Sequence, residues 1–129
     1  MKNVSLVADR FGIVASTACA LHCVLLPVLL VAGTAIPAVF LDEKIFHQAI
    51  LLLVLPAALV AFGLGCRRHK DPRVMLIGGF GLLGIVSAAF LHDLFGENGE
   101  RTLTFFATTF LIAAHVRNYR LCRSANCEH

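Results

Sequence analysis

Residues 11–41 read FGIVASTACALHCVLLPVLLVAGTAIPAVFL and contain no Asp, Glu, Lys or Arg. A helix that crosses the hydrocarbon core of a bilayer needs roughly 20 mostly apolar residues, so this stretch is long enough to span a membrane. Three more uncharged runs follow it, at residues 45–66, 74–91 and 102–116. The chain is therefore built around apolar segments of about membrane-spanning length.

The composition argues against a soluble globular domain. Of the 129 residues, 58% are hydrophobic and only 15% are charged, which is more apolar surface than one soluble core of this size can hide. None of the runs alternates apolar with polar residues, as strands of a membrane barrel do. We therefore predict an all-α membrane protein, a single four-transmembrane-helix bundle with spans at about 11–33, 45–66, 74–92 and 102–119 and a short cysteine-containing tail at 120–129.

Proline and glycine positions predict how the helices end and pack. The first run is too long for one span, and Pro27 followed by Gly33 predicts a kinked helix that ends near the glycine. Small residues four positions apart, such as Gly84 and Ala88 in the third run, would let two helix backbones approach closely.

The charges between the runs predict the orientation. The N-terminal segment, residues 67–73 and the tail each carry net positive charge, whereas residues 42–44 and 93–101 carry net negative charge. Positive connections stay on the cytoplasmic side, so we expect a multi-pass protein of the inner (plasma) membrane with both termini in the cytoplasm. The overall charge of +3 follows from this distribution, and we expect no nucleic-acid partner.

The unusual residues are five cysteines and six histidines in a chain without tryptophan. Cys19, His22 and Cys23 lie three and four positions apart, which places all three on one helical face. If the helix begins near Phe11, they lie roughly 12 to 18 Å from its inner end, close to the bilayer midplane. Two thiolates beside an imidazole suit Zn(II), Cu(I) or heavier thiophilic ions, so the three residues form the first predicted metal site.

A second cysteine pair, Cys122 and Cys127, lies in the tail after the last run. Thiols in the cytoplasm stay reduced, and a loop with four intervening residues can close on one ion, so we predict a second metal site there. Three further histidines have no assigned role. His47 and His92 are expected at a polar outer mouth that meets water, and His115 near the inner surface.

The chain resembles the MerC family, small inner-membrane proteins associated with mercuric ion uptake. The likeness rests on residues 8–12 (ADRFG), the cysteine pair inside the first span, the four-span layout and the C-x4-C-E ending. Here three residues, one of them His22, separate the first-span cysteines, where the family usually has two.

The resemblance implies a relay. Hg(II) would pass from Cys19 and Cys23 to Cys122 and Cys127, with a cytoplasmic mercuric reductase as the onward acceptor. The ion is then the cargo, and we expect no permanently bound cofactor and no enzymatic activity, with Zn(II) or Cu(I) as other candidate ions.

Two alternatives remain open from the residues alone. One is a membrane thiol-disulfide oxidoreductase in which Cys19 and Cys23 exchange electrons with a quinone, although positions one turn apart on a helix are poorly aimed for a disulfide. The other is a Zn- or haem-binding membrane protein that transports nothing, with paired histidines as ligands. The residues do not determine the oligomeric state.

Overall fold

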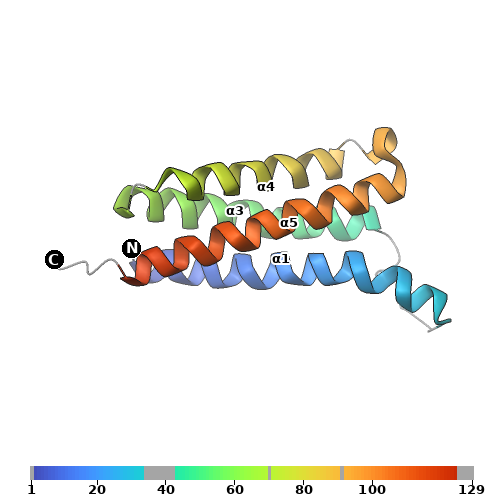
Figure 1. Ribbon diagram of the computed structural model, residues 1–129, viewed down its shortest axis with the longest axis horizontal. Coiled ribbons are helices and arrows are strands. Elements are labelled where there is room, and N and C mark those ends of the chain that lie inside the picture. The colour runs from blue at the N-terminus through green and yellow to red at the C-terminus, as the bar shows by residue number, and fades with distance from the viewer. Residues whose placement is uncertain (1, 34–42, 70, 91, 125–129) are drawn as a thin grey trace.

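The structure is a computed structural model that describes residues 2–33, 43–69, 71–90 and 92–124. Within these ranges the chain forms helices and no strand, which confirms the predicted all-α class. The helices are α1 (Lys2–Val31), α3 (Glu43–His69), α4 (Pro72–Phe90) and α5 (His92–Ser124), and Figure 1 shows them side by side in one bundle.

Three of these helices are long and apolar enough to cross a membrane. They are α1 over Asn3–Val31, α3 over Ile45–Gly65 and α4 over Pro72–Phe90. The fourth helix, α5, is not among them, so the four-span prediction holds only in its coarser form of a four-helix membrane protein. The reason lies in its sequence, because α5 carries Glu100, His115 and Asn118 among its apolar residues.

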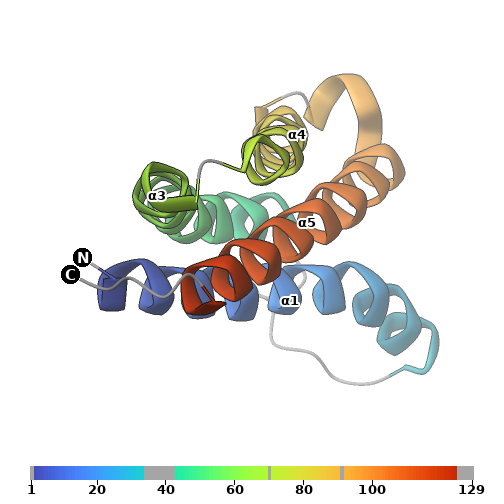
Figure 2. The ribbon, with the colours of Figure 1, turned by 60° about the vertical axis from the view of Figure 1, so that its left-hand side comes forward.

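Helix α5 lies between α1 and α4 and contacts both (Figures 1 and 2). It runs antiparallel to α1, since Ser5 near the start of α1 contacts Cys122 in the last turn of α5. The first turn of α1 and the last turn of α5 therefore lie at the same end of the bundle. We call this the inner end and the opposite one the outer end.

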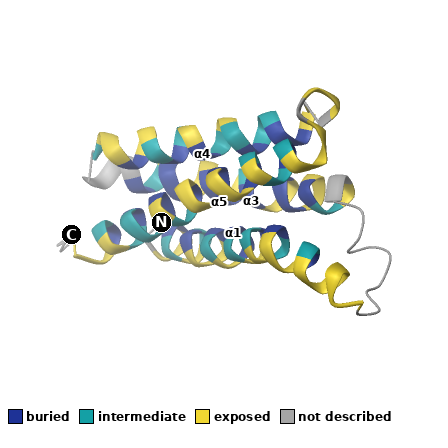
Figure 3. Cartoon of the chain, turned by 45° about the vertical axis from the view of Figure 1, so that its right-hand side comes forward, coloured by how far each residue is buried: buried dark blue, intermediate teal, exposed yellow. Residues whose placement is uncertain are grey.

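The burial pattern is that of a bundle surrounded by apolar solvent. Large apolar side chains such as Phe80, Leu83 and Phe106 are more than half exposed, and Figure 3 shows exposed residues along the outward sides of the helices. Polar residues lie inside instead. Among the residues whose side chains the structure describes, the fully or almost fully buried polar ones are Ser5, Asp9, Ser16, His47, Glu100, Thr104, Thr108, His115 and Asn118.

Two helix boundaries differ from the predicted spans. Helix α1 begins at Lys2 rather than near Phe11, continues through Pro27 and ends beside Gly33, whose positive φ of 69° suits a helix end. Helix α5 continues to Ser124, so the first residues of the predicted tail are helical. Cys19 consequently lies about 26 Å from the inner start of α1, at 1.5 Å per residue.

The connection between α3 and α4 is tied to α5 by an ion pair. The Arg117 guanidinium donates hydrogen bonds to Asp71 Oδ2 at 2.6 and 2.9 Å. These bonds, with one from the Arg73 backbone N–H, hold the pKa of the Asp71 carboxyl below its usual range. The pair therefore stays ionised at neutral pH at the inner end.

Glycines allow α4 and α5 to pack closely, as the small-residue spacing predicts. A Cβ on Gly81 would lie 2.7 Å from Leu111 Cγ and 3.0 Å from the Ala107 carbonyl oxygen, and one on Gly84 would lie 2.8 Å from Ala107 Cβ. Real Cβ atoms essentially never lie within 3.0 Å of a heavy atom of another helix, so the two helices reach this separation because glycine is present there.

Replacing Gly81 by alanine should destabilise the fold by about 1–3 kcal/mol, because the added methyl group forces α4 and α5 apart. Gly79→Ala is the matched control, since a Cβ there meets no atom within 4 Å and alanine favours the helix. Unfolding in mixed detergent micelles measures both. Equal stability of the two variants would contradict the close α4–α5 contact.

Candidate metal centre

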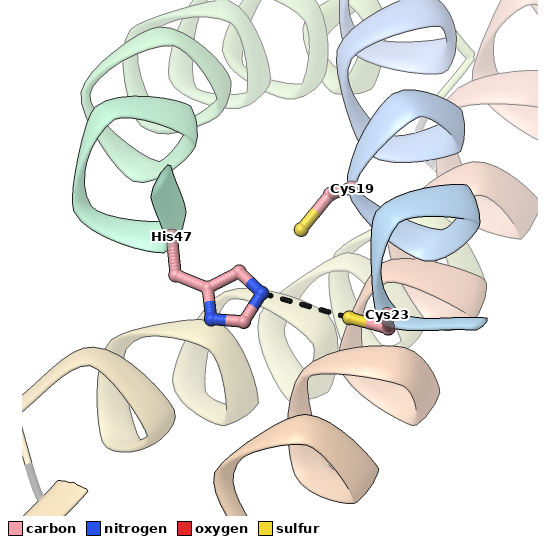
Figure 4. Close-up of side chains that lie close together, drawn as sticks. All are labelled: Cys19, Cys23 and His47. Carbon is pink, nitrogen blue, oxygen red and sulfur yellow. Dashed lines mark hydrogen bonds between the residues drawn. The ribbon is translucent and has the colours of Figure 1, made fainter. Parts of the chain in front are cut away.

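Two thiols and one imidazole meet inside the bundle. The ligand atoms of Cys19, Cys23 and His47 all lie within 4.8 Å of one another (Figure 4). Helix α1 supplies the two cysteines, one turn apart on the same face, and α3 supplies the histidine. All three side chains are buried, with at most 4% exposed.

A carboxylate from a third helix orients the imidazole. His47 Nδ1 lies 2.9 Å from Glu100 Oε1 of α5, and His47 Nε2 lies 3.6 Å from Cys23 Sγ. When Nδ1–H donates to Glu100, the Nε2 lone pair points at the thiols. Metal-binding histidines in proteins are commonly fixed in this way by a carboxylate on the other ring nitrogen.

The structure places His22 beside this group. Its ring stacks on Phe46 with centroids 3.8 Å apart and meets the His47 ring edge-on at 5.8 Å. The cluster thus contains both predicted cysteines, but His47 and not His22 supplies its imidazole. The predicted role of His22 as a metal ligand stays a prediction.

Sequence reasoning missed His47 and Glu100. His47 was expected at an outer mouth in contact with water, but only 1% of it is exposed, so that expectation is wrong. The side chain of His92, its expected neighbour, lies outside the described residues. One signal in the sequence could have identified His47 and Glu100, because an ionisable residue inside or next to an apolar span is a functional candidate by default.

The cluster lies toward the outer end of the bundle. His47 is one turn from the start of α3 at Glu43, and Cys19 is about 26 Å from the inner start of α1. The predicted distance of roughly 12 to 18 Å from the inner end assumed a helix that begins near Phe11, and α1 begins earlier, at Lys2. The predicted depth in the membrane stays a prediction. The thiols are therefore nearer the outer end of the bundle than the inner end.

The donor set has a clear chemical preference. Thiolates and imidazole bind soft and borderline metals and are poor ligands for Mg or Ca. Two thiolates also neutralise a divalent ion, which removes most of the cost of holding a charge away from water.

Cys122, from the predicted tail site, lies inside the bundle at its inner end. Only 1% of it is exposed, and its Sγ is 3.8 Å from Ser5 Oγ. It belongs to the last turn of α5 and not to a loop. Its predicted partner Cys127 lies outside the described residues, so the pairing of these two thiols stays a prediction.

A protein-family model described as MerC mercury resistance protein matches residues 9–120. No curated protein and no solved structure matches the chain. The matched range includes both thiols of the cluster, His47 and Glu100, and ends just before Cys122.

We predict that His47→Ala weakens Zn(II) binding more than His22→Ala does, because Zn(II) needs more ligands than two sulfurs. Glu100→Gln should weaken it about 10- to 100-fold, through loss of the carboxylate that orients His47. Competition with a chromogenic chelator measures all three affinities in detergent. A larger loss in His22→Ala would instead assign the third ligand to His22.

Proposed function

Because the chain belongs to the MerC mercury resistance protein family, we propose that it carries Hg(II) inward across the bacterial inner membrane. The observation that carries this proposal is the buried group of Cys19, Cys23 and His47. A two-thiol site suits a soft dication, and its position toward the outer end suits capture of an ion arriving from outside.

We propose that transfer proceeds by exchange of thiolate ligands. Cys19 and Cys23 bind Hg(II) as a neutral dithiolate, and the thiolates of Cys122 and Cys127 take it over at the inner end. Each exchange makes one metal–sulfur bond as another breaks, in the manner of thiol exchange. A cytoplasmic mercuric reductase is the proposed acceptor, and its consumption of the ion would drive net uptake.

His47 serves as an auxiliary ligand in this proposal. Two sulfurs satisfy Hg(II), whereas Zn(II) and Cu(I) draw more on the imidazole, so these ions remain alternative cargoes. The proposal includes no resident cofactor and no enzymatic step. The oriented imidazole also favours metal binding over the alternative of thiol-disulfide exchange with a quinone, which does not need it.

We propose that α5 is the fourth membrane span. Its polar residues Glu100, His115 and Asn118 are fully buried against the other helices, whereas Phe106 and Phe110 are about half exposed. The face that would meet lipid is thus apolar, although the average composition of the helix is not. Polar residues in a span are tolerated where they face the bundle interior.

We propose that the inner end faces the cytoplasm. Arg10 and Arg123 lie there, together with the Arg117–Asp71 pair. Positively charged segments are retained on the cytoplasmic side of the inner membrane.

Vesicles containing the protein should accumulate Hg(II) faster than empty vesicles, and Cys19→Ser or Cys23→Ser should abolish the difference. One thiolate cannot form the neutral two-sulfur site that makes deep burial tolerable. Cys66→Ser is the matched control, since that thiol has no part in the proposed relay. Quinone reduction by the unmodified protein without Hg(II) uptake would identify an oxidoreductase and overturn the transport proposal.

Reporter fusions test the orientation separately. A phosphatase joined after His129 should be inactive, because that enzyme folds only outside the cytoplasm, and a cysteine introduced at Glu97 should react with a membrane-impermeant reagent from outside. An active phosphatase fusion would reverse the proposed orientation.

A further inference from the structure

A second buried histidine–carboxylate pair lies in the inner half of the bundle. His115 Nδ1 of α5 is 2.9 Å from Asp9 Oδ1 of α1, and neither side chain is exposed. Asn118 Nδ2 donates to Asp9 Oδ2 at 2.8 Å and to the Ala61 carbonyl oxygen at 3.1 Å. Both carboxylate oxygens of Asp9 therefore have partners, and α1, α3 and α5 are joined at this level.

The other ring nitrogen of His115 has no partner among the described residues. His115 Nε2 is fully buried, and the face of the ring packs against the backbone of α1 at Gly12, where a Cβ would collide with the ring atoms. A buried polar atom without a partner is costly and is rare in native proteins unless it serves a purpose. Gly12 thus makes room for the imidazole ring, and its Nε2 has no hydrogen-bond partner among the described residues.

This arrangement repeats that of the outer site. In both pairs a carboxylate lies 2.9 Å from Nδ1, which leaves Nε2 as the coordinating atom. At the outer site Nε2 lies 3.6 Å from Cys23 Sγ, and at the inner site Nε2 has no hydrogen-bond partner among the described residues. The carboxylate also provides a negative charge beside any cation bound to Nε2.

The position of His115 is midway between the two groups of thiols. Along α1 there are seven residues, about 10 Å, from Cys19 to Gly12, and seven more from Gly12 to Ser5, which contacts Cys122. Metal–sulfur bonds are only about 2.3 Å long, so an ion cannot pass between thiols about 20 Å apart in one exchange.

Side chains that can donate electron pairs bridge this interval at one-turn spacing. Going from Cys19 toward the inner end along the buried face of α1, the first such residue is Ser16. Its Oγ also has no partner among the described residues. Next come the level of Gly12, where His115 lies, then Asp9, and then Ser5 beside Cys122. Successive levels are about 4.5 to 6 Å apart.

We propose that His115 is a transfer ligand for the same thiophilic cation, bound through Nε2 on its way from Cys19 and Cys23 to Cys122. This rests on the transport function proposed above. Nε2 donates its lone pair to the ion as the metal–sulfur bonds break, and sulfur retains both electron pairs of those bonds. The Asp9 carboxylate beside the ring offsets part of the charge of the ion at this level. The Cys122 thiolate then displaces Nε2. No atom is oxidised or reduced.

His115→Asn tests the proposal, because the Asn amide keeps an N–H for Asp9 and removes Nε2. In vesicles of phosphatidylethanolamine and phosphatidylglycerol with glutathione inside, the variant should still bind Hg(II) at Cys19 and Cys23. Delivery to the internal glutathione should slow at least ~10-fold, the order of effect expected when metal coordination is impaired. Thr108→Val is the matched control, since the Thr108 hydroxyl donates only to backbone carbonyls of its own helix, and should deliver normally.

A second measurement reports the ligand directly. In protein with 15N-labelled imidazoles and Cys122→Ser, Hg(II) should shift the NMR resonance of His115 Nε2. An unmoved resonance, or normal delivery by His115→Asn, would overturn the transfer role while leaving Hg(II) uptake by the unmodified protein intact. Absence of uptake by the unmodified protein would overturn the transport function and this inference together.

Discussion

The contact between α1 and α5 determines much of this structure, because polar groups among apolar helices are stable only when they meet one another. Along this contact Asp9 pairs with His115 and Asn118, and Ser5 with Cys122. These pairs require the two helices to be antiparallel and fix which residues lie opposite each other. The same requirement turns the polar stripe of α5 inward and leaves Phe106 and Phe110 exposed on the outside of the bundle.

The outer thiol group depends on that packing as well. With α5 held against α1, Glu100 is available to orient His47 of α3, and His47 in turn faces Cys23. Two helices, α1 and α3, therefore supply the soft ligands, and a carboxylate from α5 orients one of them. An ion with two thiolates is neutral there, which makes a buried site in a small bundle physically reasonable.

The helical class, the end of α1 near Gly33, the close packing at Gly84 and the cysteine pair could all be predicted from the sequence, since each follows from local composition or from helical periodicity. His47 and Glu100 could not, because their burial depends on how α1, α3 and α5 meet. The burial of the polar residues of α5 could not be predicted for the same reason. Helix spacing shows which residues share a face, but it does not show which face of a neighbouring helix lies opposite.

X-ray absorption at the mercury edge, on the full chain in vesicles with one equivalent of Hg(II), tests the central claim most directly. If Cys19 and Cys23 form the capture site, the ion should have two sulfur neighbours, and these should persist when Cys122 and Cys127 are both replaced by serine. Loss of both sulfur neighbours in that double variant would contradict the account, because it would place the bound ion at the tail and not inside the bundle.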